Sequence, residues 1–586
     1  MNPVCFPFTD DTGKEMRDLM SQQTELLAAI AAGNASAEFI DASFGALLDG
    51  TNTTKVFWLW WPLSATGGAS KYDRLCRFFA MMAKAGYKLA YTLRFYLDTV
   101  SSDYTGTPLD DLADGRSAAP LVTDTTTDVT DWAEEDLMTW YIRGNALSLA
   151  DGTMNLLALE GEREFDITGE TAPVYCFSLA LCLKEWEDAS YMYNSWRTYP
   201  GNGYVPMAGD VAPDGTMRVM TWHPAYCGGL NTKGGMTSGI GKPPMVWVSA
   251  NAGIPLARKT TTYEGLWNDC DQQFALSAWR LRHWTKSNSG KLEGCTSYNY
   301  QYTPAVAEAN VKRVVLTTAQ AANILPGSGV CLGERSGETS PTTDRNQSYN
   351  HNIFNWAKVV SVTSEVIGGV EYGIVNLDLT DAISPTTTML LSTMPWPSGT
   401  TECLPGHSDG CMGNLTNGKY PYRVAGVEMQ IGNYTEQLDP LWQASLVDDH
   451  WHYDVYSCRD SEKQSGSITA NYEKTSSFDL PNANKWSWNY IRALNKLAAE
   501  SMNPVKFGGS DSTYVRAAFF SPGSAGLYAP WRSGNLNDNG ACGIPCANGN
   551  NSPANSNWNG SPRHADENKV RTMRAKALYR ACGFDR

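Results

Sequence analysis

The segment GKYPYRVAGVEMQIGNYTEQLD, Gly418–Asp439, predicts a strand, a tight turn and a second strand. Apolar residues alternate along it, as in strands with one buried face, so we expect them to fill a core. Gly426 and Gly432 supply turn conformations at low steric cost. Arg423 and Glu428 stand on opposite sides of the first turn, and we expect them to pair across it.

Further along the chain, the stretch GNLNDNGACGIPCANGNNSPANSNWNGSPR covers residues 534–563. Nine of the residues from Asn535 to Asn559 are Asn, and Trp531 and Trp558 bracket most of them. Glycine turns and buried Trp side chains can fix a backbone, and exposed side chains on a fixed backbone change at little cost. The pattern therefore indicates a binding loop on a rigid scaffold. The alternative is an ordinary long polar loop.

Two resemblances follow from these stretches. The core Tyr422-Arg423-x-x-Gly426-x-Glu428 with a following Gly-Asn pair resembles a segment of C-type-lectin-fold domains in the formylglycine-generating-enzyme branch. The C-terminal stretch resembles the variable region of proteins that retroelements diversify, such as phage tail proteins of the major tropism determinant type. In that family, reverse transcription misreads template adenines, so Asn codons become codons for many side chains.

The resemblance covers residues 401–586 and assigns roles within a variable region at about 525–563. The fixed framework positions would be Trp531, Gly534, Gly540, Trp558, Gly560 and Arg563. The variable, ligand-contacting positions would be Tyr528, Arg532, Asn535, Asn537, Asn539, Asn548, Asn550, Asn551, Asn555, Asn557 and Asn559. The catalytic cysteines of the enzyme branch have no convincing match here, so the resemblance does not imply sulfatase activation.

The whole chain of 586 residues is too long for one core and predicts several domains. Its many Gly, Trp and Tyr residues favour an α+β protein that is mostly β and loop. We expect an N-terminal virion-attachment region at 1–140 and a β-rich domain at 141–310 with one long helix, Gly265–Lys286. A small β-barrel or sandwich at 311–400 and the C-type-lectin-fold domain at 401–586 would follow.

Charge and hydropathy exclude several classes of function. The net charge of −15 argues against a nucleic-acid surface, which needs clustered Lys and Arg. The N-terminus MNPVCFPFTDDTGKEM predicts no secretory signal, and no apolar run is long enough to insert in a membrane. The 14 Cys show no metal-binding spacing and predict mostly buried free thiols.

Two short motifs raise the question of a metal. Trp267-Asn268-Asp269 matches a calcium-binding triplet of animal lectins, but one Asn/Asp pair is no calcium site, and a helix N-cap explains it better. His450, His452 and Asp454 would share one face of a strand, as metal ligands could. The alternative, which we favour, is an aromatic strand whose core face carries Trp451, Tyr453 and Val455. We predict no bound metal.

Two other motifs raise the question of nucleophilic chemistry. GHSDG, 406–410, has the letters of a nucleophile elbow around Ser408, but its flanks predict neither the strand nor the helix that the elbow needs. Cys542 and Cys546 lack the spacing of a thioredoxin-type motif, which leaves a structural pair or two free thiols.

Together these features predict a phage tail receptor-binding protein. It would bind a host cell-surface protein or glycan without catalysis or cofactor, and it would assemble with other phage tail proteins in the virion. The resemblance implies a homotrimer. The alternatives are a tail-associated glycan hydrolase, which needs two carboxylates in one cleft, and a purely structural tail or baseplate protein.

Overall fold

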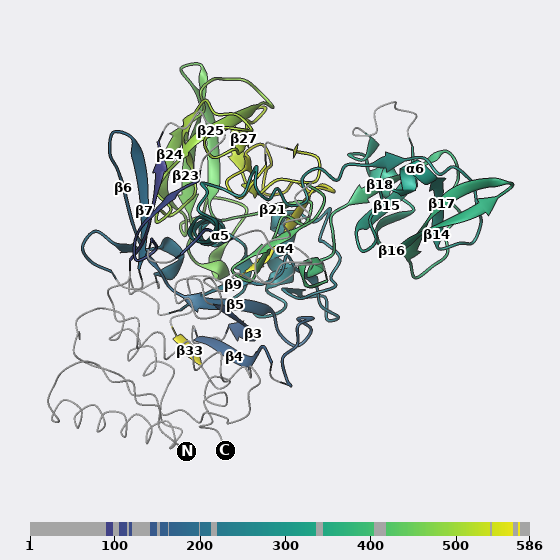
Figure 1. Cartoon of the computed structure of the whole chain (residues 1–586), viewed down its shortest axis with the longest axis horizontal. Coiled ribbons are helices and arrows are strands. Elements are labelled where there is room, and N and C mark those ends of the chain that lie inside the picture. Colours follow the sequence, from purple (N-terminus) through teal and green to yellow (C-terminus); the bar gives the residue numbers. More distant parts are fainter. Residues whose placement is uncertain are drawn as a thin grey trace.

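The fold is mostly β, with several sheets and few helices, which confirms the expected class of secondary structure (Figure 1). The computed structural model describes residues 90–97, 105–113, 116–119, 141–148, 153–161, 163–197, 200–211, 220–335, 344–403, 418–539, 542–565 and 572–574. Most of the expected virion-attachment region, Ser408 and Gly540 lie outside the described residues. Within the described part, no helix is both long and apolar enough to cross a membrane.

Two five-stranded sheets form the N-terminal part of the described chain. One has the order β2-β1-β7-β6-β8, and the other has the order β33-β4-β3-β5-β9. The strands of the first sheet are β1 Tyr91–Tyr96, β2 Thr107–Asp110, β6 Cys182–Glu187, β7 Tyr191–Arg197 and β8 Val205–Pro206. Those of the second are β3 Tyr141–Ser148, β4 Thr153–Leu159, β5 Val174–Leu179, β9 Met220–Pro224 and β33 Thr572–Arg574. Strand β33 runs parallel to β4, so residues near the C-terminus complete a sheet of early residues.

Helix α5, Asp269–His283, lies at the centre of the molecule. The expected helix from Gly265 to Lys286 is shorter because β12, Gly265–Leu266, pairs with β32, His564–Ala565. Asn268 is the N-cap: its side-chain oxygen accepts from the backbone N–H groups of Cys270 and Asp271. This capping explains the Trp-Asn-Asp triplet, as expected.

The helix is buried along almost its whole length, although it carries many polar residues. Thirteen of its 15 residues are buried, so the polar ones need partners inside the protein. Gln272 Nε2, for example, donates to the carbonyl of Ile544 at 2.7 Å, and His223 Nδ1 lies 2.7 Å from Asp271 Oδ1. These bonds tie the helix to segments that are far away in the sequence.

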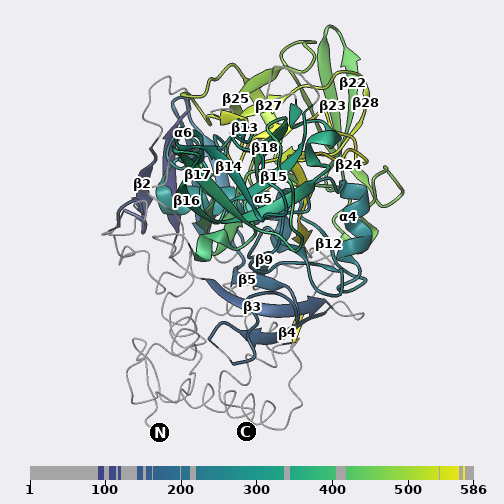
Figure 2. The ribbon, with the colours of Figure 1, turned by 90° about the vertical axis from the view of Figure 1, so that its right-hand side faces the viewer.

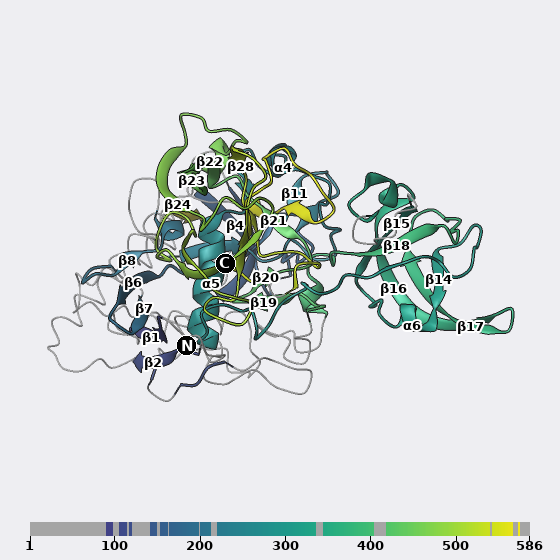
Figure 3. The ribbon, with the colours of Figure 1, turned by 90° about the horizontal axis from the view of Figure 1, so that it is seen from above.

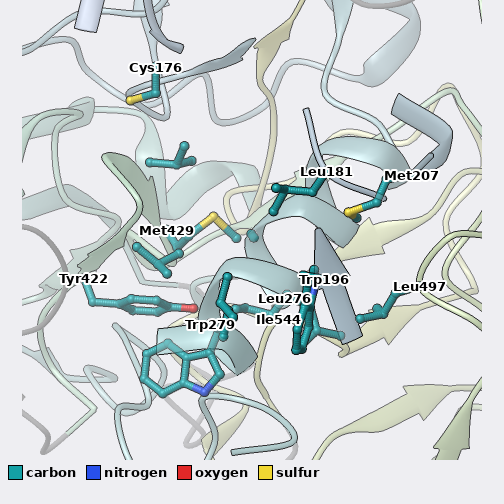
Figure 4. Packing of buried hydrophobic residues seen from close by; sticks show 14 of the residues in the cluster. Cys176, Leu181, Trp196, Met207, Leu276, Trp279, Tyr422, Met429, Leu497 and Ile544 are labelled. Carbon is teal, nitrogen blue, oxygen red and sulfur yellow. The ribbon is translucent and has the colours of Figure 1, made fainter. Parts of the chain in front are cut away.

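The core around α5 combines early and late parts of the chain. Figure 4 shows Trp196 and Trp279 packed with Tyr422, Met429 and Ile544. The cluster as a whole runs from Tyr91 to Ala565. The proposed boundaries at residues 310 and 400 stay predictions, but this core draws residues from both sides of them.

Residues 301–394 form a six-stranded antiparallel sheet that projects from the rest of the molecule (Figures 1 and 3). Its order is β13-β18-β15-β16-β17-β14, and it has an apolar core of its own. A bridge between Val306 and Val315 pairs the residues that follow β13 with β14. The chain next to one edge strand of the sheet therefore contacts the other edge strand. The strands are β13 Gln301–Tyr302, β14 Arg313–Thr317, β15 Gly329–Glu334, β16 Phe354–Ile367, β17 Val370–Asp378 and β18 Met389–Met394, with helix α6 Thr318–Ala321 after β14.

The C-terminal part holds a seven-stranded sheet, β26-β25-β27-β30-β29-β21-β31, and a four-stranded sheet, β24-β23-β22-β28 (Figure 2). The seven strands, in chain order, are β21 Tyr434–Glu436, β25 Trp488–Leu494, β26 Pro504–Phe507, β27 Ala518–Phe520, β29 Trp531–Arg532, β30 Ala547–Asn548 and β31 Gly560–Pro562. The four are β22 Leu441–Val447, β23 His450–Ser457, β24 Glu473–Asp479 and β28 Gly526–Tyr528. Helix α4, Ala250–Ala257, and the hairpin of β10 Gly229–Leu230 with β11 Met236–Thr237 pack nearby.

The segment Gly418–Asp439 contains the predicted hairpin, β19 Tyr422–Val424 and β20 Val427–Met429. Gly426 has φ = 75°, as its turn requires. The prediction that Arg423 and Glu428 form an ion pair is wrong. Arg423 instead pairs with Glu402, and the Glu428 carboxylate accepts from the backbone N–H groups of Gly399 and Thr401, at 2.9 and 3.3 Å. Both side chains are buried, and other loops supply their partners.

A buried ion pair joins α5 to β29. Arg532 Nε and Nη2 donate to the two carboxylate oxygens of Asp269, at 2.9 and 2.7 Å, and both side chains are almost fully buried. The backbone of Met502 adds a donor to Asp269 and an acceptor for Arg532. The pair therefore fixes the first turn of α5 against the strand that precedes the Asn-rich stretch.

We expect Asp269→Ala to lower the free energy of unfolding by about 3–5 kcal/mol, because it leaves the Arg532 charge buried without its partner. Urea unfolding followed by Trp fluorescence measures the change. Lys463→Ala is the matched control: it removes a solvent-exposed ion pair with Asp460 and should cost at most about 1 kcal/mol. Equal losses for the two variants would contradict the structural role of the buried pair.

Candidate functional site

The Asn-rich stretch is held in place by buried framework residues. Trp531 is in β29, which pairs with β21 and β30, and its ring packs 5.8 Å from the ring of Tyr434. Strand β21 also pairs in parallel with β31, which follows the stretch. The two ends of the stretch therefore join the same sheet, one on either side of β21.

Two framework glycines lie where a side chain does not fit. Gly534 has φ = 92°, and a Cβ atom there would overlap the Sγ of Cys542. A Cβ on Gly560 would lie 2.6 Å from the ring of Trp531 and would also overlap the Glu436 carboxylate. Both positions therefore require glycine, the first for its backbone conformation and both for space.

The last two framework side chains are fixed by partners outside the stretch. Trp558 Nε1 donates to Asn346 Oδ1 at 2.6 Å, and the guanidinium of Arg345 lies 4.1 Å from the Trp558 ring centre. Arg563 donates to the carbonyls of Glu428 and Pro224 at 2.8 and 2.7 Å. Its guanidinium also stacks on Trp267, at 3.8 Å. All the framework residues that the structure describes are buried.

The predicted variable residues divide into three groups by exposure. The exposed ones are Asn537, Asn539 and Asn555. The half-buried ones are Asn548, Asn550, Asn551, Asn557 and Asn559. The buried ones are Tyr528, Arg532 and Asn535.

The buried group is a correction to the sequence-based assignment, because these side chains do not lie where a ligand could contact them. Arg532 is in the ion pair with Asp269. Tyr528 packs in the core between the C-terminal sheets and donates to the carbonyl of Ser524 at 2.7 Å. Asn535 Oδ1 accepts from the backbone N–H of Asn537 at 2.7 Å and shapes the turn. All three stabilise the scaffold.

The first arm of the stretch, 535–539, lies against residues 296–299, just before the projecting sheet. Asn299 Nδ2 donates to Asn537 Oδ1, and Ser297 Oγ donates to Asn539 Oδ1 at 3.0 Å. The backbone N–H of Asn539 donates to the carbonyl of Thr296 at 3.0 Å. Sequence reasoning did not identify Ser297 and Asn299, because nothing in their local pattern shows which distant loop they contact.

The second arm, 548–557, is anchored mainly through its backbone carbonyls. The carbonyls of Asn551 and Asn557 accept from the backbone N–H groups of Ala529 and Trp247, at 2.8 and 2.9 Å. The carbonyl of Pro553 accepts from the backbone of Asn251 at 3.0 Å. Such bonds do not depend on the side chain of the accepting residue, so they survive most substitutions in the arm.

The Asn side chains of the second arm also bond to one another. Asn548 Oδ1 accepts from the backbone N–H of Asn550 at 3.1 Å and from Asn551 Nδ2 at 3.2 Å. Asn555 Nδ2 donates to Asn551 Oδ1 at 3.2 Å. The two arms therefore present amide donors and acceptors to solvent on a backbone that other elements hold.

The other sequence motifs have structural explanations. Strand β23 alternates as expected, with Trp451, Tyr453 and Val455 buried. His452 lies between two carboxylates, 2.6 Å from Asp479 and 3.0 Å from Asp454, and Asp479 raises its pKa. Among the described residues, no group of three or more His, Cys, Asp and Glu side chains could hold a metal ion.

Cys542 and Cys546 are both buried free thiols, one of the two expected alternatives. Burial raises the pKa of the Cys542 thiol well above its usual value, so it is not ionised at neutral pH. Cys542 therefore packs behind Gly534 and does not offer a reactive thiolate.

No protein-family model matches this chain, and no curated protein is detectably similar to it.

We expect Gly534→Ala to lower the free energy of unfolding by about 2–4 kcal/mol, because the methyl group meets Cys542 in a left-handed backbone conformation. Gly368→Ala is the matched control: Gly368 also has positive φ, but a Cβ there would meet nothing within 4 Å. It should cost only the conformational part, about 1–2 kcal/mol. Urea midpoints of the two variants measure the difference, and equal midpoints would refute the packing argument.

Proposed function

We propose that this protein is a receptor-binding adhesin of a phage tail, and that the two Asn-rich arms are its ligand-contacting surface. The main support for the proposal is that the predicted framework and variable positions differ in burial. The described framework positions are buried, whereas eight of the eleven predicted variable positions are exposed or half-buried. A surface designed to vary needs this division, because exposed substitutions cost little and buried ones cost much.

The anchoring of the arms supports the same role. Backbone carbonyls of Asn551, Asn557 and Asn559 accept bonds from residues outside the stretch. Replacing these side chains leaves those bonds in place, so many sequences can use one backbone. Antibody loops combine a rigid scaffold with changeable contacts in the same way.

A C-type lectin fold for residues 401–586 is part of the proposal. The hairpin β19–β20 supports it. The parallel pairing of β21 with β31 also supports it, because this pairing joins the centre of the domain to the end of the Asn-rich stretch. The ligand would be a host cell-surface protein or glycan, bound without catalysis or cofactor.

The proposed setting is the virion, where the protein would assemble with other tail proteins as a homotrimer. Several copies on one particle would convert weak single contacts into firm attachment. Amide groups alone provide modest contacts, so multivalency would suit this surface.

Deep sequencing of the gene in a growing population tests the diversification. Substitutions should concentrate at the codons for the exposed and half-buried Asn residues of the stretch, Asn537, Asn539, Asn548, Asn550, Asn551, Asn555, Asn557 and Asn559. They should spare Trp531, Gly534, Trp558 and Arg563. Codons for Asn471 and Asn484, which are exposed residues outside the stretch, provide the background rate. Equal rates inside and outside the stretch would remove the retroelement interpretation.

Attachment of the labelled full-length protein to a panel of intact bacterial cells tests the binding role. For a strain that binds, we expect the double variant Asn537→Ala and Asn555→Ala to bind at least about tenfold more weakly while its melting temperature is unchanged. The matched control is Asn471→Ala with Asn484→Ala, which should bind normally. Protease or periodate treatment of the cells distinguishes a protein receptor from a glycan. Normal attachment of the first variant would favour a structural tail protein.

A further inference from the structure

A second candidate site lies away from the two arms. A cavity of about 410 Å³ opens between the β6–β7 hairpin, the C-terminal half of α5 and the β25–β26 pair. None of its lining residues belongs to the Asn-rich stretch. Its volume falls within the range of small-molecule sites in proteins.

Cationic side chains outnumber carboxylates in the lining of this cavity, although the protein as a whole is acidic. Arg280, Lys286, Arg492, Lys496 and Lys506 contribute to it, against the carboxylates of Glu185 and Glu187 alone. The whole chain, by contrast, carries a net charge of −15. Cationic side chains concentrated in a concavity attract anions.

Arg280 is the centre of this lining, because it is a buried cation that Glu185 attracts only from beyond ion-pair distance. Its Nε donates to the carbonyl of Lys286 and its Nη1 donates to Asn194 Oδ1, both at 3.0 Å. Within the described part of the chain, Nη2 has no hydrogen-bond acceptor and no carboxylate lies within ion-pair distance of the guanidinium. Burial lowers the pKa of Arg280 to about 10, so it stays charged at neutral pH.

The nearest carboxylate in the lining already has other partners. Glu185 accepts from Asn194 Nδ2 at 3.1 Å and from the backbone N–H groups of Leu497 and Ala498 at 3.0 and 3.3 Å. Burial raises its pKa, which further weakens it as a counter-charge. Arg532 differs from Arg280, because Arg532 is a buried arginine with a bidentate carboxylate partner inside the protein.

We propose that this cavity binds a small anionic ligand, a carboxylate or a phosphate ester, whose oxygens accept from Arg280 Nη2. A guanidinium held by two neutral acceptors keeps its remaining N–H groups in one fixed plane, which suits these oxyanions. Lys496 and Lys506 lie exposed at the cavity and add attraction for the approaching anion. This site would be invariant, unlike the arms, and it does not depend on the adhesin role.

Isothermal titration calorimetry on the full-length protein tests the proposal. The probes are glucuronate for the carboxylate, glucose 6-phosphate for the phosphate ester and glucose as the neutral control. We expect at least one anion to bind with an affinity that falls as salt increases, while glucose does not bind. Absence of heat with both anions at millimolar concentration would overturn the proposal.

Arg280→Gln should weaken binding of the anion at least about tenfold. Arg313→Gln, which removes an arginine from the distant six-stranded sheet, should leave the affinity unchanged. If Arg280→Gln does not fold, the exposed pair Lys496→Gln and Lys506→Gln decides the question. A several-fold loss of affinity in that double variant supports the site, and an unchanged affinity in either the Arg280 or the double-lysine variant overturns it.

Discussion

The ion pair between Asp269 and Arg532 is the interaction on which the rest of the structure depends. It joins the first turn of a central, mostly buried helix to the strand from which the Asn-rich stretch begins. Both charges are desolvated, so each is tolerable only because the other is present and the backbone of Met502 bonds to both. Arg532, which the sequence analysis assigned to the ligand-contacting surface, thus links the core to the candidate binding surface.

The same principle applies to several other polar groups of the interior. Arg563 spans from β20 to β9 by bonding to two backbone carbonyls, and Glu428 accepts from three separate backbone N–H groups. Buried polar groups of this kind have to be satisfied, and each satisfied group fixes the relative position of distant segments. In Arg280 the terminal nitrogen Nη2 has no hydrogen-bond acceptor among the described residues, which is why its cavity is a candidate site for an anion.

In the C-terminal region the scaffold residues determine the backbone path, whereas the side chains of the two arms can vary. Glycines that tolerate no Cβ and Trp rings packed in the core determine the path of the chain. Backbone carbonyls anchor the second arm, so side chains such as that of Asn555 are free to differ. Only substitutions at the framework should carry a large cost in stability, because they create overlap or leave cavities.

From the sequence alone it was possible to predict the mostly β class, the β19–β20 hairpin, the cap of α5 and the alternation of β23, because local periodicity and turn chemistry determine these features. The burial of Trp531 and Trp558 also followed from residue type. Tertiary structure alone decided that Arg532 and Asn535 are buried, that Arg423 pairs with Glu402 and that Ser297 and Asn299 contact the first arm. Each of these depends on which distant segment supplies the partner, and a local pattern contains no information about that choice.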